Sequence, residues 1–171
     1  MIITPATYTN YFKQAAINNK LIGHNPPLVT HFYALSIEEI LNDARSDWDG
    51  GFTMVLENLE ANFNDLKNDN ERAFPACAFS IIKQFNPKTG DYDDLRALID
   101  QAYNICYQVI SKIRKDYKNR ILSGLEISSF HLHYVANILN SGFGYRCTFN
   151  FNQPASLGFD PTQWNNETPL Q

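Results

Sequence analysis

The stretch Phe143-Gly144-Tyr145-Arg146-Cys147-Thr148-Phe149-Asn150-Phe151 alternates large apolar residues with small or polar ones. Because successive side chains of a β-strand point to opposite faces, this pattern predicts a strand with one buried face. A second alternating run covers residues 129–134, and the Asn-Ser-Gly sequence at residues 140–142 supplies turn chemistry between the two runs. The sequence therefore predicts a β-hairpin near the C-terminal end.

Other segments show apolar residues at three- and four-residue steps, which is the spacing of one helix face. The first covers residues 7–19, and a much longer one covers residues 92–119. A capping box at Ser36-Ile37-Glu38-Glu39 predicts a further helix over residues 37–45. Asp91, Asp93 and Asp94 stand at the start of the long segment, where negative charge complements the helix dipole. We therefore expect N-terminal helices and one long amphipathic helix.

The remaining periodic segments predict strands. Residues 52–57 alternate after a Gly-Gly pair, and an apolar run over residues 73–85 contains Pro75, which suits a strand that begins, or has its edge, near that proline. Residues 62–70 are polar and rich in Asn and Asp, which predicts a solvated connection. The order of segments predicts an α+β fold: a single antiparallel or mixed sheet of about four to five strands, packed by the long helix.

The length of the chain indicates one domain. Its 171 residues, 44% of them hydrophobic, suffice for one core. We expect residues 1–153 to form a single α+β domain and residues 154–171 to form an extended C-terminal tail. That tail contains Leu157, Phe159 and Trp164, large apolar residues that are costly to expose. They dock on a partner or on this chain's own surface, two alternatives that the sequence leaves open. We expect partner contacts at these three residues and at Arg146.

The formal net charge of −4 argues against unspecific binding to nucleic acid, which needs clustered Lys and Arg. The one basic cluster, within residues 112–120, is typical of the C-terminal end of a helix. No window approaches the ~20 apolar residues that span a bilayer, so we expect no membrane partner. The three cysteines are far apart and lie in apolar segments, which makes a disulfide framework improbable and favours folding in the cytoplasm.

Few residues suggest chemistry. His131 and His133 share one strand face and could hold a metal, but no third ligand stands near them in the sequence. Cys147 falls on the apolar face of its strand, where a thiol acts as a small hydrophobe. The acidic residues around Asp91 are explained by helix capping. We expect no catalytic residue, no cofactor and no metal ion.

The layout of residues 7–152 resembles the small tail-terminator, tail-completion and neck proteins of long-tailed bacteriophages and related contractile particles. The segments that carry the resemblance are residues 52–58, 74–85, 92–119 and 144–151, together with the ending Phe159-Asp160-Pro161-Thr162-Gln163-Trp164. The resemblance implies a non-enzymatic structural subunit of a virion or phage-like particle, assembled in the bacterial cytoplasm. It implies a ring of identical copies, commonly a hexamer, that contacts tail-tube, sheath or neck proteins.

Two other classes of protein remain open at the level of sequence. One is a monomeric partner-binding or immunity-type module that recognises its partner through the sheet. The other is a small enzyme with a pocket between the sheet and the long helix, using the histidine pair or the acidic cluster at Asp91.

Overall fold

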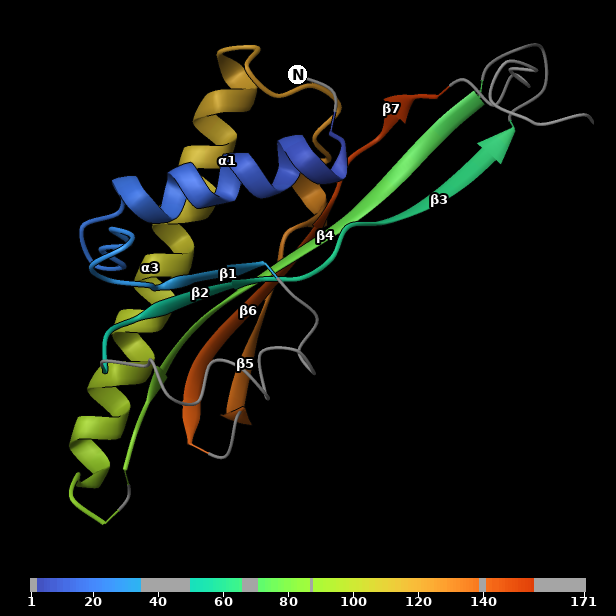
Figure 1. Ribbon diagram of the computed structural model, residues 1–171. Coiled ribbons are helices and arrows are strands. Elements are labelled where there is room, and N and C mark those ends of the chain that lie inside the picture. Colours follow the sequence, from blue (N-terminus) through green and yellow to red (C-terminus); the bar gives the residue numbers. More distant parts are fainter. Residues whose placement is uncertain (1–2, 35–49, 66–70, 87, 139–140, 156–171) are drawn as a thin grey trace, which may run out of the picture.

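The computed structural model describes residues 3–34, 50–65, 71–86, 88–138 and 141–155. These residues form an α+β fold with two α-helices and a mixed sheet of seven strands (Figure 1). In chain order the elements are α1 (Pro5–Asn18), β1 (Phe32–Ala34), β2 (Thr53–Leu56), β3 (Glu60–Asp65), β4 (Glu71–Gln84), α3 (Tyr92–Lys118), a 3₁₀ turn η1 (Ile127–Ser129), β5 (His131–Ile138), β6 (Gly142–Asn150) and β7 (Gln153–Pro154).

Strand β4 organises the sheet. It is 14 residues long and pairs antiparallel with β2 and β3 along one side and with β6 and β7 along the other. Strand β1 then adds in parallel to β2, and β5 adds antiparallel to β6, which gives the order β1-β2-β4-β6-β5. Strands β1 and β5 are therefore the outer strands of the body of the sheet.

Strand β4 begins at Glu71 and passes through Pro75, so the sequence-based start near the proline is displaced by four residues. The carbonyl of Pro75 accepts the amide of Phe151 at 2.9 Å, and so this residue faces the β6 and β7 side. Ala76 pairs with Asn150 and Ala73 with Gln153, an offset of three residues on both strands. Strands β6 and β7 thus follow one register, and they are separated where the proline lacks an amide to donate.

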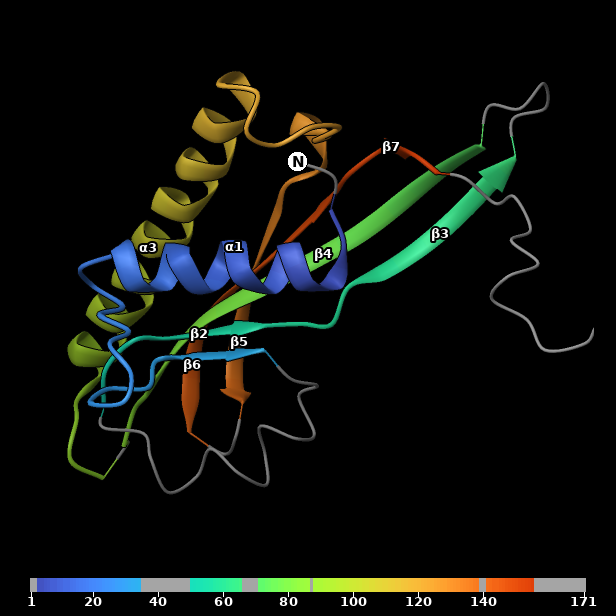
Figure 2. The ribbon, with the colours of Figure 1, turned by 45° about the horizontal axis from the view of Figure 1, so that its top comes forward.

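Strands β3 and β4 continue beyond the body of the sheet as a projecting two-stranded ribbon (Figures 1 and 2). We call β3 together with residues 71–76 of β4 the β3–β4 arm. Residues 62–65 belong to β3, so the expectation that residues 62–70 form a solvated connection was wrong for this part. Residues 66–70 lie outside the described residues. The expectation failed because β3 is exposed on both faces, which removes the apolar alternation that marks a strand.

The sheet has seven strands, more than the four or five expected. The additional strands carry no clear pattern: β1 has three residues, β7 has two, and β3 is polar. Strands β5 and β6 are antiparallel neighbours from His131 paired with Thr148 to Ile138 paired with Gly142. They are not the last part of the sheet, because β7 follows them along β4.

Helix α3 packs against β4 and β6 and covers one face of the sheet. It starts at a capping box in which Asp91 accepts the amide of Asp94 at 2.8 Å, as the acidic cluster predicts. Helix α1 crosses the same face beside α3 (Figure 2), capped by Thr4, with Tyr8, Phe12 and Ala16 buried. The helix expected over residues 37–45 lies outside the described residues.

The core fills the space between the helices and the sheet. The ring of Phe12 on α1 lies 5.5 Å from that of Phe79 on β4 and 6.1 Å from that of Phe149 on β6. The amide of Ala155 donates to the carbonyl of Glu71 at 3.1 Å, so the chain is held to β4 up to this residue. No helix in the described part of the chain is both long and apolar enough to cross a membrane.

Candidate functional site

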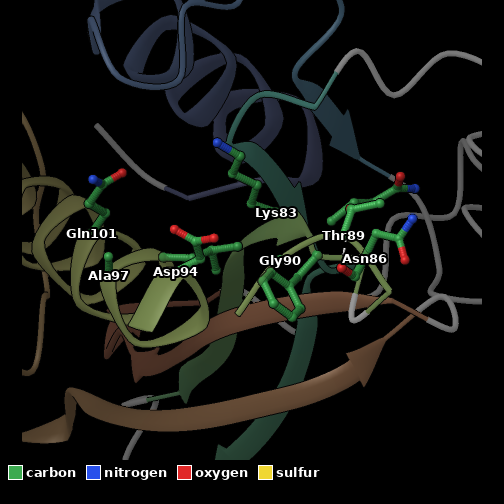
Figure 3. A pocket seen from close by; sticks show the side chains of 10 residues that line it. Lys83, Asn86, Thr89, Gly90, Asp94, Ala97 and Gln101 are labelled. Carbon is green, nitrogen blue, oxygen red and sulfur yellow. Dashed lines mark hydrogen bonds between the residues drawn. The ribbon is translucent and has the colours of Figure 1, made fainter. Parts of the chain in front are cut away.

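A hollow of about 410 Å³ opens between the end of β4 and the first turns of α3 (Figure 3). Its charged side chains already have structural roles. The amino group of Lys83 lies 5.2 Å from the ring centre of Phe52, and Asp94 accepts the amide of Asp91 at 3.3 Å to complete the helix cap. Lys83 and Asp94 are the charged groups among the lining residues, and both already contact neighbouring groups of the fold.

The histidine pair lies elsewhere, on the edge strand β5. The rings of His131 and His133 are exposed, with centres 6.4 Å apart. Within the described residues, no group of three His, Cys, Asp or Glu side chains is placed to hold a metal ion. The pair lies on the face of the sheet opposite the helices, where Arg146 is the cross-strand neighbour of His133.

All three cysteines are free and buried, in agreement with the absence of a disulfide framework. Burial raises the pKa of the Cys147 thiol to about 12, despite the positive charge of Arg146. Burial likewise raises the pKa of Cys77 to about 12. Since the thiolate is the nucleophile, these thiols are inert near neutral pH.

Arg146, which we expected to contact a partner, is held within the chain. Its Nε lies 2.5 Å from Oε1 of Glu57, and its Nη2 lies 2.6 Å from Oε2. This bidentate ion pair joins β6 to the end of β2 across β4. The hydrogen bond to Glu57 raises the pKa of Arg146. The two partners are 89 positions apart in the chain, which explains why no local pattern signals the pair. Leu157, Phe159 and Trp164 lie outside the described residues.

The exposed strand edge on the β3–β4 arm is the first of two surfaces that sequence reasoning missed. Strand β3 pairs with β4 along one edge, and no described strand pairs with its other edge. Its side chains from Glu60 to Asn64 are exposed, and Phe63 is 58% exposed. Such an edge presents unpaired amides and carbonyls to any strand that approaches it.

The second surface is aromatic and combines α3 with β5. The ring of Tyr145 lies 5.3 Å from that of Tyr103 on α3 and 6.0 Å from that of Tyr134 on β5, both in edge-on contact. Tyr107 follows one turn later on α3 and is 58% exposed. We call these four residues the tyrosine patch. A sequence signal existed, because Tyr103 and Tyr107 are four residues apart and off the buried stripe of the helix.

Tyrosine is enriched in protein–protein interfaces, because its ring buries much apolar area while its hydroxyl stays hydrated. The tyrosine patch adjoins the outer edge of β5, with which no described strand pairs. Comparisons of the chain with known protein families, curated proteins and solved structures found no match. The function is therefore inferred from these two surfaces.

Proposed function

We propose that this chain is a non-enzymatic structural subunit that assembles with identical copies into a closed ring. The observation that carries the proposal is that the outer edges of β3 and β5, with which no described strand pairs, lie on opposite sides of β4 in the sheet order. Two different, oppositely placed surfaces make a head-to-tail contact, and such contacts close into a ring when the rotation between copies allows it.

The layout resemblance supports a specific place for the ring. Small α+β subunits of this kind end the tail or join it to the neck in long-tailed phages and related contractile particles, as a tail terminator or head–tail completion protein. We propose the same role here, with a hexamer as the expected ring and tail-tube, sheath or neck proteins as neighbours. The acidic net charge is compatible with a lumen that does not retain DNA.

A small enzyme remains the weaker alternative. Its expected pocket corresponds to the hollow between β4 and α3, in which Lys83 and Asp94 serve structural contacts. A monomeric binding module could also use an exposed sheet edge. It does not require two edges that face opposite ways, and this difference makes the oligomeric state the discriminating property.

The test is mass spectrometry of density-purified particles from the source cells, together with native mass spectrometry of the purified chain. A fixed low ratio of this chain to the major tube or capsid protein, and a closed oligomer in solution, are the expected results. Absence from every particle fraction would contradict the role in a particle. A chain that stays monomeric up to high concentration would favour the binding module.

A further inference from the structure

We propose that β3 of one copy pairs with β5 of the next copy, so that the sheet continues from subunit to subunit around the ring. This inference rests on the proposed function and names the contact that would build the ring. It starts from the outer edges of β3 and β5, with which no described strand pairs; the outer strand β1, on the same side of β4 as β3, has only three residues.

The two edges agree in length and shape. Strand β3 has six residues, and β5 is regular over residues 131–135 before the bulge between Val135 and Ile138. A bulge blunts an edge, so the regular part of β5 is where another strand can add. Five to six residue pairs are typical of a strand ladder in globular proteins.

The faces of the two strands also agree. Phe63 is paired with Ala73, and Tyr134 is aligned through Tyr145 with Ile81. Ala73 and Ile81 are an even number of residues apart on β4, so Phe63 and Tyr134 both lie on the helix-covered face. Copies related by a rotation that continues the sheet keep the same face outward. The exposed ring of Phe63 therefore reaches the tyrosine patch of the next copy.

On the opposite face no like charges meet. Glu60 is aligned with Ala76, and His131 is aligned through Thr148 with Ala78, so these two side chains share the face away from the helices. Strand β3 contains acidic residues and no basic one, whereas β5 contains two histidines and no acidic residue. Pairing β3 with β5 thus opposes no like charges.

Pairing β3 with β3 about a twofold axis is the alternative contact between copies. It would use the edge of β3 alone and leave the edge of β5 and the tyrosine patch uncovered. The head-to-tail contact covers both edges and brings Phe63 to the tyrosine patch. It is therefore the second copy's β5, not its β3, that suits the edge of β3.

The strand directions define the geometry of the ladder. Strand β3 runs opposite to β4, and β5 runs with β4 because two antiparallel steps separate them. Rotation about an axis parallel to the strands preserves the strand directions. The β3 strand of one copy therefore meets the β5 strand of the next copy in an antiparallel pair. Strand β3 is aligned with residues 71–76 of β4, and β5 with residues 78–84, so successive copies are staggered. Closing such a sheet requires the strands to tilt, as in a barrel.

Disulfide cross-linking tests this contact, because the three native cysteines are buried and at most 3% exposed. Asn62→Cys or Asn64→Cys is combined with His131→Cys or His133→Cys in the full chain, which covers three antiparallel registers. All four positions are exposed and lie on the face away from the helices. Directly opposed residues place their Cβ atoms about 4.5–5.5 Å apart, and the closer, non-hydrogen-bonded pairs approach the ~3.5–4.5 Å of a disulfide. Phe63→Cys with His133→Cys is the control, since these side chains lie on opposite faces.

The expected result is a ladder of covalent oligomers on a non-reducing gel from at least one double variant, ending at the ring number, with none from the control pair. Each single variant should stay uncross-linked. Cross-linked dimers from Asn62→Cys alone would show β3–β3 pairing and overturn the inference. A ring in native mass spectra without any ladder would overturn this contact and leave the proposed ring intact, whereas a monomer in both assays would overturn the ring as well.

Discussion

The hydroxyl of Tyr8 takes a place in the β-ladder beside Ala78. It donates to the Ala78 carbonyl at 3.0 Å and accepts the Ala78 amide at 3.1 Å. Glu57 donates its amide to the same carbonyl, and in a regular ladder the Ala78 amide would return that bond to Glu57. The register of β4 with β3 differs by one residue from that with β2, which displaces the expected acceptor. A side chain of α1 thus completes the sheet where the β3–β4 arm begins.

Replacement of this hydroxyl should weaken the fold. Tyr8→Phe leaves the buried Ala78 amide without the acceptor that the hydroxyl provides, and we expect a loss of about 1–3 kcal/mol in the free energy of unfolding. Burial also raises the pKa of Tyr8, so the hydroxyl keeps its proton over the accessible pH range. Urea unfolding measures the loss. Tyr103→Phe, at a residue 43% exposed, is the matched control and should change the midpoint little. Equal midpoints for the two variants would contradict the role of Tyr8.

Close contact between β4 and β6 should make Gly144 irreplaceable. A Cβ atom there would lie 1.9 Å from the carbonyl oxygen of Ile81, and two backbones cannot relax as a flexible side chain can. We expect Gly144→Ala to cost about 3 kcal/mol or more, or to prevent folding. Gly50→Ala is the comparison, because nothing lies within 4 Å and only its φ of +86° is strained. We expect about 1–2 kcal/mol there. Thermal unfolding of both variants decides the question, and similar losses would refute the steric explanation.

The sequence predicted elements that bury one face. The alternation of β6 and the three- and four-residue steps of α3 each arise because the core removes one side of the element from water. Strand β3 has no such pattern, since residues 60–64 are exposed on both faces of the sheet. The strand forms because β4 offers an edge. Local pattern carries no information about an edge contributed by another segment.

The candidate site was less predictable than the fold. The sequence predicted Arg146 as a partner contact, and the structure pairs its guanidinium with Glu57, two strands away in the sheet. Phe63 lies within a polar run, where no alternation marks it as part of a strand. Tyr103 and Tyr107 were predictable in principle from their spacing off the apolar stripe of α3. What could not be predicted is that Tyr145 on β6 unites Tyr103 and Tyr134 in one patch, because such contacts follow from tertiary packing.

Stability should fall at acid pH through His24. Its side chain is 4% exposed, and its Nδ1 accepts the amide of His31 at 3.2 Å, which requires the neutral ring. Burial lowers the pKa of His24, and the positive charges of Lys13 and His31 lower it further. As the pH falls below about 6.5, the unfolded chain binds a proton that the folded chain resists, so stability decreases.

His24→Asn isolates this effect, since Asn keeps an acceptor oxygen near the position of Nδ1 and does not titrate. We expect the melting temperature of the native chain to fall more between pH 7.5 and pH 5 than that of the variant. Differential scanning calorimetry at both pH values provides the measurement. Parallel decreases in the two proteins would assign the acid sensitivity to other groups.

Assembly, in contrast to folding, should depend on Phe63. This side chain is 58% exposed in the single copy, so Phe63→Asp should change the free energy of unfolding by less than about 0.5 kcal/mol. In the proposed ring the new carboxylate would be buried against the tyrosine patch without a partner, and losing such an aromatic anchor costs about 2 kcal/mol or more per contact. We therefore expect the concentration for half-assembly to rise at least about tenfold.

Leu28→Asp, at a loop residue 81% exposed and outside both surfaces, is the matched control. Sedimentation velocity across a concentration series distinguishes the two variants. If Phe63→Asp and Leu28→Asp assemble alike, the β3–β4 arm does not form the contact.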